Sequence, residues 1–197
     1  MTQRFRRGAL AACALAALAG PATAQQRQAR ACVRFDQPLI VGTMFGAAEG
    51  QKPGDTILTE NGIAVTLETY HQADGGAGFG QASVDAMLVP GGTRQSLRTN
   101  AIAVRFDFTG LPYPAKGASF HFVDFGGSKD LAANDDKPLA DGIVAMAGRM
   151  TGGTTVSVTT GPTAADSTPG TVTLSGPIKS LSVGGRDFWI DAVCAEP

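Results

Sequence analysis

Short stretches in which hydrophobic and polar residues alternate recur along most of the chain. The clearest lie at 63–68, 101–108, 154–160, 170–175 and 187–194. In each of them about every second residue is apolar, and most residues between are Thr, Ser or charged. This spacing places the apolar side chains on one face of an extended strand. It is typical of half-buried antiparallel strands.

Glycine- and proline-containing pairs separate these stretches. Asn61-Gly62 is a strong hairpin signal between two alternating runs, and Gly-Gly and Pro-Gly pairs mark the other breaks. We predict about eleven short strands, at 32–36, 55–60, 62–70, 82–88, 101–108, 117–125, 141–149, 154–160, 170–175, 178–183 and 187–194. The segment 141–149 is also compatible with a short helix. Turn signals at this spacing predict an all-β fold, an antiparallel β-sandwich with little helix.

The first 24 residues have the pattern of a secretory signal peptide. Three arginines precede a short apolar run at 8–20, and Ala22-Thr23-Ala24 supplies a small-x-small cleavage site. A membrane anchor is the alternative, but a spanning helix needs about 20 apolar residues and this run is shorter. The sequence therefore predicts cleavage after Ala24 and one domain over 25–197, without a membrane span. The product would be periplasmic or secreted, in an oligomeric state that the sequence does not indicate.

Two cysteines remain after that cleavage, Cys32 and Cys194, near the two ends of the predicted domain. In an oxidising compartment such a pair predicts a disulfide. Two buried free thiols are the alternative. A metal site is disfavoured because no partner ligands lie near either cysteine in the sequence.

Charge and composition exclude some classes of protein. The formal net charge is −1, and removal of the predicted signal peptide takes away three arginines and no acid. A mildly acidic chain lacks the basic surface that nucleic acid requires. With 43% hydrophobic residues the chain is also unlike a disordered protein.

No catalytic motif stands out. The chain has no nucleophile-elbow serine and no metalloprotease histidine pair. His121 and Asp124 are three residues apart, so in a strand they face opposite sides of the sheet. The segment 124–136 holds many Asp, Asn and Gly residues. It predicts either a turn that offers carboxylates to a hard cation or a solvated turn. We therefore expect a protein that is not an enzyme, and a small exported hydrolase remains an alternative.

A resemblance to a known group rests on the two ends of the domain. Cys32–Asp36, the Gly42-Thr43 and Gly54-Asp55 turns, and Phe188–Val193 look like the ends of bacterial exported jelly-roll modules. These are β-sandwiches of the galactose-binding-like and carbohydrate-binding-module type. The resemblance implies a jelly-roll arrangement and a structural calcium ion held by Asp36 and Asp191. The chain departs from the pattern in having Asp where the group often has Glu, and in lacking a second acid beside Asp191. Ordinary strand-end acids are the alternative.

Such modules stack sugar rings on exposed aromatic side chains. Tyr113 lies between two prolines, which predicts a stiff exposed tip. Tyr70 and Trp189 are further candidates, although Trp189 is also expected to pack beside the predicted disulfide. We expect a non-catalytic binding module for carbohydrate or a cell-surface ligand. A structural or adhesion-type exported protein is the main alternative.

Overall fold

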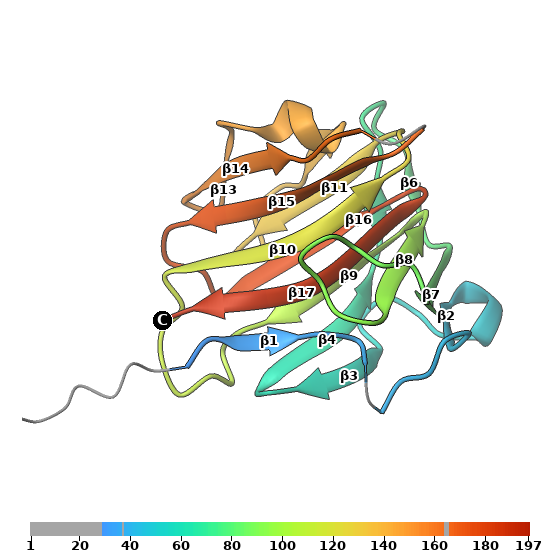
Figure 1. Cartoon of the computed structure of the whole chain (residues 1–197), viewed down its shortest axis with the longest axis horizontal. Coiled ribbons are helices and arrows are strands. Elements are labelled where there is room, and N and C mark those ends of the chain that lie inside the picture. Colours follow the sequence, from blue (N-terminus) through green and yellow to red (C-terminus); the bar gives the residue numbers. More distant parts are fainter. Residues whose placement is uncertain (1–28, 37, 164–165) are drawn as a thin grey trace, which may run out of the picture.

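The computed structural model describes residues 29–36, 38–163 and 166–197. Two antiparallel sheets pack face to face, with the nine-stranded sheet in front in Figure 1 and the six-stranded sheet behind it. The predicted all-β sandwich is thereby confirmed. The predicted signal peptide, residues 1–24, lies outside the described residues.

The nine-stranded sheet contains the last strand of the chain in a central position. Its order is β13 (Met150–Thr151), β14 (Thr154–Thr160), β15 (Thr168–Ser175), β10 (Gly117–Asp124), β17 (Phe188–Glu196), β8 (Ser96–Asn100), β7 (Gln81–Asp85) and β2 (Met44–Gly46). One edge of β17 pairs with β10. The other edge pairs with β8 along its first half and with β1 (Ala31–Val33) along its second half.

The six-stranded sheet forms the other layer. Its order is β12 (Leu139–Asp141), β11 (Lys129–Ala133), β16 (Ser180–Gly185), β9 (Ile102–Asp107), β4 (Ile63–Glu68) and β3 (Thr56–Glu60). A small hairpin, β5 (Tyr70–His71) and β6 (Ala77–Gly78), follows β4. Two short 3-10 turns, Ala47–Glu49 and Ile143–Met146, are the helical elements in the part of the chain that the structure describes.

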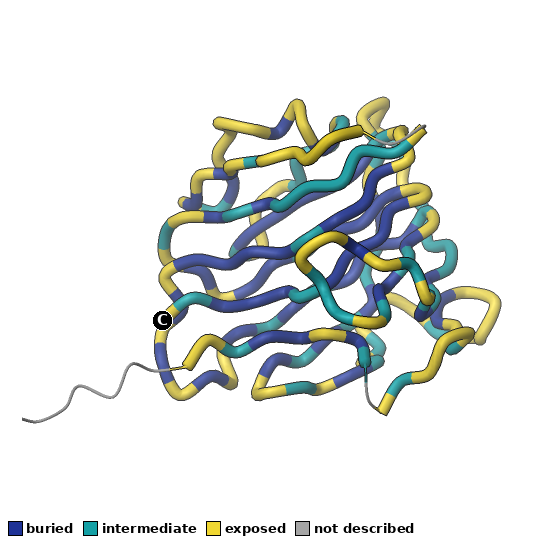
Figure 2. Tube along the Cα trace, viewed as in Figure 1, coloured by how far each residue is buried: buried dark blue, intermediate teal, exposed yellow. Residues whose placement is uncertain are grey.

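The core lies between the sheets and is built by the predicted alternation. Leu67, Val104 and Phe106 point inward from the six-stranded sheet and have no exposed surface. Phe120 and Phe188 point inward from the other sheet and meet edge to face. Figure 2 shows this burial along the middle of the strands, with exposed segments at their ends. Hydrophobic burial of these faces is the main favourable term in folding.

The Asn61-Gly62 hairpin is confirmed, because it joins β3 and β4 with both residues at positive φ. The single strand predicted at 101–108 is only partly correct. The structure has β9 there, and it also has β8 directly before it, which the sequence did not predict. Ala101 separates the two strands at a φ of 56°, and the chain passes there from one sheet to the other.

The acidic segment 124–136 is not an extended turn, so that prediction is wrong. Asp124 ends β10, and Lys129–Ala133 forms a fully buried strand. A tight turn follows, with Asn134 and Asp135 both at positive φ, a conformation that Asn and Asp tolerate better than most residues. Of the two interpretations of 141–149, the strand is absent and the short helix is closer to the structure, because β12 ends at Asp141 and the 3-10 turn Ile143–Met146 follows it.

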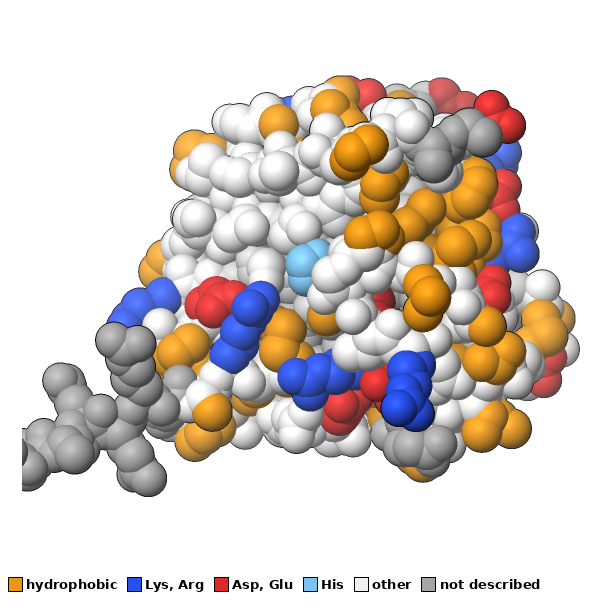
Figure 3. Space-filling model, viewed as in Figure 1, with side chains coloured by type: hydrophobic (Ala, Val, Ile, Leu, Met, Phe, Trp, Pro, Cys, Tyr) orange, Lys and Arg blue, Asp and Glu red, His pale blue; other side chains and the backbone are white. Residues whose placement is uncertain are grey.

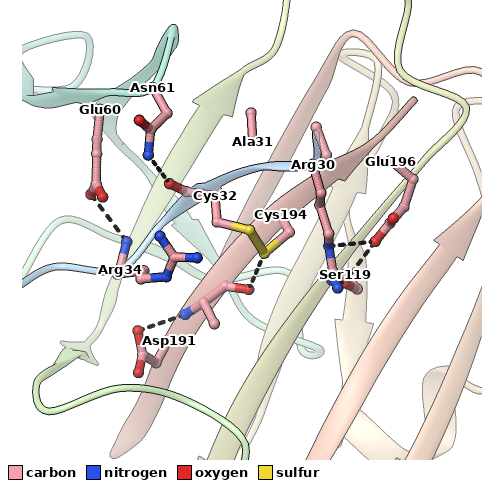
Figure 4. Close-up of a disulfide and its surroundings, with 12 residues drawn as sticks. Arg30, Ala31, Cys32, Arg34, Glu60, Asn61, Ser119, Asp191, Cys194 and Glu196 are labelled. Carbon is pink, nitrogen blue, oxygen red and sulfur yellow. Dashed lines mark hydrogen bonds and ion pairs between the residues drawn. A yellow bond between two sulfur atoms is a disulfide. The ribbon is translucent and has the colours of Figure 1, made fainter. Parts of the chain in front are cut away.

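The Cys32–Cys194 disulfide is present and joins β1 to β17 on the outer face of the nine-stranded sheet (Figure 4). The two residues are direct partners in the ladder, with Cα atoms 4.0 Å apart. Beside the bridge, Arg30 forms an ion pair with Glu196 and contacts the Ser119 hydroxyl (Figure 4). No helix among the described residues is long and apolar enough to cross a membrane.

Candidate functional site

The three aromatic residues predicted as ligand platforms are buried. Tyr113 is 8% exposed, and its hydroxyl accepts a hydrogen bond from the Ala31 amide and donates to the Ala195 carbonyl. Tyr70 has no exposed surface and donates to the Ser128 carbonyl. The stiff tip predicted around Tyr113 therefore turns inward, and its ring fills the core instead of stacking on a ligand.

Trp189 packs on the outer face of the nine-stranded sheet, as its alternation with Phe188 predicted. It is 7% exposed because Val89 and Val123 cover it. Its indole nitrogen donates to Asp85 at 3.0 Å, and the Arg98 guanidinium lies 4.9 Å from the ring centroid. The packing prediction was correct, but the partners are these residues and not the disulfide.

The two acids proposed to hold calcium lie near each other but do not fit that ion. Both oxygens of Asp191 already accept N–H donors, from Thr93 and from Ala192. The Gln95 amide nitrogen donates to the backbone carbonyls of Phe35, Asp36 and Leu39, at 3.0, 2.9 and 3.3 Å. Gln95 thus engages three backbone carbonyls beside Asp36, whereas calcium takes six to eight oxygen ligands. Within the described ranges, no three His, Cys, Asp or Glu side chains gather as metal ligands.

Burial raises the pKa of Asp191, one of these two acids. Asp191 has no exposed surface, and desolvation, aided by the nearby Asp36 charge, raises its pKa to about 6 against the effect of the N–H donors. One Asp36 oxygen is buried without a hydrogen-bond partner. Asp191 accepts hydrogen bonds from the amide and the hydroxyl of Thr93 and so holds the loop around Thr93 against β17. The alternative of strand-end acids accounts for these contacts.

His121 and Asp124, three residues apart in the sequence, have different partners in the structure. It lies on the outer side of β10, where its Nδ1 is 2.9 Å from the Thr171 hydroxyl. Burial, with a smaller effect of the Arg30 charge, lowers its pKa. Asp124 is buried and forms an ion pair with Lys129 at 2.8 Å. The two residues therefore do not form a site.

The outer face of the nine-stranded sheet is divided between polar and hydrophobic surface. Figure 3 shows uncharged white surface over its left part, a histidine near the centre, charged groups below it and hydrophobic side chains gathered on the right. The polar surface follows from the alternation in β14 and β15. These strands turn their threonines and serine outward, at Thr155, Ser157, Thr159, Thr171 and Thr173.

A polar cleft opens instead on the outer face of the six-stranded sheet. Its cavity has a volume of about 490 Å³ and is lined from β4, β9, β11 and β16, together with the segments around them. The titratable side chains in its lining are Glu68, His71, Arg105, Asp130, Asp135 and Asp136, and Ser180 and Ser182 add hydroxyl groups. No aromatic ring of Phe, Tyr or Trp is among the described residues that line it.

The strand register explains why two acids meet in this cleft. Asp130 on β11 lies opposite Gly184, Gly184 lies opposite Ala103, and Ala103 lies opposite Glu68 on β4. Between the two acids this row carries no side chain larger than a methyl group. Gly184 cannot be enlarged, because a Cβ there would lie 2.3 Å from the Ile102 carbonyl oxygen. Ala103 and Gly184 are buried and do not line the cavity, so the middle of this row is covered, and Tyr70 reaches from the end of β4 to the Ser128 carbonyl beside β11.

Asp130 is the most unusual group in the cleft. It is 2% exposed, and one carboxyl oxygen accepts a hydrogen bond from the His71 amide at 2.9 Å. Its other oxygen is buried without a partner. Burial, reinforced by the Glu68 charge, raises the pKa of Asp130 to about 7, although backbone N–H donors oppose the shift. Near neutral pH this carboxyl group is therefore partly protonated.

Glu68 reaches across β9 to β16. Its carboxylate accepts a hydrogen bond at 2.5 Å from the hydroxyl of Ser182, which lies in the neighbouring row of the register, opposite Arg105 and Ala132. Arg105 lies between them on β9, but its guanidinium pairs closely with Asp135 and is 3.8 Å from Glu68. Asp135 is carried by the tight turn after β11. Arg105 is therefore paired mainly with Asp135 on this turn.

The sequence did not single out these residues. Asp130 lay in a segment interpreted as a turn, although Leu131 and Ala133 alternate with it as a strand would. Glu68 lay in a predicted strand, facing outward. No family model, curated protein or solved structure matches the chain.

Proposed function

We propose that the protein is an exported binding module that holds a carbohydrate in the cleft on the outer face of the six-stranded sheet. The predicted signal peptide and the disulfide support export, since such bonds persist in oxidising compartments. A carbohydrate is the ligand class expected from the sequence. We assign its binding to the polar cleft, because the three candidate aromatic residues are buried.

One observation carries this proposal: the cleft lining gathers hydrogen-bonding side chains from adjacent strands, among them Glu68, Arg105 and Ser182, and no aromatic ring of a described residue. Recognition would therefore rest on hydrogen bonds and not on ring stacking. Polar groups of this kind give orientation and specificity in ligand sites.

A glycan array on the oxidised protein tests the proposal, followed by titration calorimetry with any sugar that binds. Glu68→Gln should weaken binding at least tenfold, because a carboxylate that lines the cleft is replaced by an amide. Asp141→Asn is the matched control, since Asp141 is an exposed acid on strand β12. A blank array would overturn the proposal and favour the structural or adhesion-type protein.

A further inference from the structure

We infer that the carbohydrate bound in the cleft is a linear chain that continues through two further cavities around the end of the six-stranded sheet. This inference rests on the proposed function and narrows its ligand class from carbohydrates in general to chains of several sugar units. Three cavities that follow one another along the surface carry it, together with the side chains that neighbouring cavities share.

Two cavities lie beside the cleft at one end of the six-stranded sheet. β11 and β9 end there, and β16 begins between them (Figure 1). The second cavity has a volume of about 480 Å³ and is lined by the turn after β11, the turn before β14 and the segment before β16. The third cavity, of about 510 Å³, is lined by the segment before β16 and the loop after β9. Volumes of this size are typical of small-ligand sites.

The three cavities adjoin at residues that they have in common. Asp135, on the turn after β11, lines both the cleft and the second cavity. Pro177 and Lys179, on the segment before β16, line both the second and the third cavity. All three residues are exposed. A ligand chain can therefore pass from one cavity to the next across exposed side chains, without displacing a buried group.

The side chain of Asn134 holds the floor of the second cavity in place. Its amide nitrogen donates to the carbonyls of Gly152 and Pro177, at 2.6 and 2.9 Å. Its amide oxygen accepts a hydrogen bond from the Lys179 amide at 2.6 Å. One side chain thus connects the three segments that line this cavity. A path that is fixed before binding costs little additional ordering when a ligand occupies it.

The chemistry along this path suits the two kinds of surface on a sugar unit. The cleft offers charged and hydroxyl side chains to sugar hydroxyls. Beyond it, the ammonium of Lys179 adds three donors and forms no ion pair with any residue that the structure describes. The third cavity presents the exposed rings of Pro114 and Pro177, on which the CH groups of a sugar ring can pack. A chain of sugars can therefore use all three cavities.

Titration calorimetry with short and long oligosaccharides tests the inference on the oxidised protein. The probes are the dimer and the hexamer of β-1,4-glucan, β-1,3-glucan, β-1,4-xylan, β-1,4-mannan and chitin. The hexamer of a chain that binds should bind at least tenfold more tightly than its dimer, a difference of about 1.4 kcal/mol. One or two net hydrogen bonds beyond the cleft supply a gain of this size.

Lys179→Ala and Pro177→Ala locate the additional contacts, because both side chains lie beyond the cleft. Each should reduce the preference for the hexamer to within about threefold and leave the affinity for the dimer unchanged. Glu68→Gln, in the cleft, should weaken both lengths alike. Lys137→Ala is the matched control, because Lys137 is exposed and lines none of the three cavities. Thermal melting of each variant shows whether it is folded.

The outcomes separate the inference from the proposed function. Equal affinities for dimer and hexamer would overturn the inference and leave carbohydrate binding in the cleft intact. A preference for the hexamer that survives in both Lys179→Ala and Pro177→Ala would place the additional units elsewhere and overturn it as well. If none of the five chains binds, the inference fails, and the proposed function fails with it only when the glycan array is also blank.

Discussion

Replacing Asp130 by asparagine should make the protein more stable at alkaline pH while changing it little in acid. The side chain is buried, so its charged form is held in an unfavourable environment in the folded state. Asparagine has nearly the same shape and can still accept the hydrogen bond from the His71 amide. It cannot ionise. The variant thus removes the cost of ionising Asp130 and keeps most of its packing.

The size of the effect follows from the pKa of Asp130. Its pKa is raised from 3.8 to about 7 in the folded state. Each unit corresponds to 1.36 kcal/mol, so the shift corresponds to about 4 kcal/mol. A group with a raised pKa stabilises the folded state fully below its unfolded pKa and loses this contribution as the pH rises through the folded pKa. The loss therefore falls between about pH 4 and pH 7.

Urea denaturation of both proteins at pH 4, 5, 6, 7 and 8 measures this difference. The free energy of unfolding of Asp130→Asn minus that of the wild type should rise with pH and level off above pH 7, by up to about 4 kcal/mol. Asp191, whose pKa is also raised, is present in both proteins and cancels. Asp141→Asn serves as the exposed control. A difference that stays flat between pH 4 and pH 8 would refute the reasoning about Asp130.

Four further expectations concern the scaffold. Cys194→Ser should lower the free energy of unfolding by about 2–5 kcal/mol in urea, and an unchanged midpoint would count against a stabilising bridge. Lys129→Met should lower the free energy of unfolding by about 3–5 kcal/mol, because a buried ion pair would be broken. The Lys129 ammonium pairs with Asp124 and donates hydrogen bonds to the carbonyls of Gly126, Gly127 and Arg186. An unchanged free energy of unfolding would show that apolar packing compensates for these contacts. Tyr113→Phe should reduce stability by about 1 kcal/mol without affecting ligand binding, and weaker binding would restore Tyr113 as a contact residue. Calcium and a chelator should give the same melting temperature, whereas a rise with calcium would show that Gln95 does not take the place of the ion.

The sequence predicted those parts of the fold that local patterns determine. Strands such as β14 and β15 were found because Val and Thr alternate, and the Asn61-Gly62 turn because its backbone needs positive φ. β11 was missed because its polar residues, Lys129 and Asp130, are buried by contacts from other strands. The sequence did not indicate the candidate site either, because its residues are also brought together by other strands. Asp130 and Glu68 are far apart along the chain, and only the register of four strands brings them into one row.

Tyr113 is another residue whose position the local sequence did not indicate. Two flanking prolines indicate a stiff backbone, and they do not indicate which way the ring points. Its hydroxyl bonds to Ala31 and Ala195, at the opposite ends of the described sandwich sequence. Long-range partners of this kind have no local signal. The outward face of β4, by contrast, was predictable from alternation, and only the significance of Glu68 on that face was not.

The central place of β17 has a consequence for the order in which the chain can assemble. This strand comes after every other one in the sequence, yet β10, β8 and β1 all pair with it. Until it docks, this sheet is divided into two groups of paired strands with unpaired edges, β13, β14, β15 and β10 in one and β8, β7 and β2 in the other, and β1 has no partner strand. Contacts over such long sequence separations make folding slow, and exposed edges in the meantime favour association between chains. Loss of the last few residues should therefore impair refolding yield far more than loss of an equally long peripheral strand such as β2.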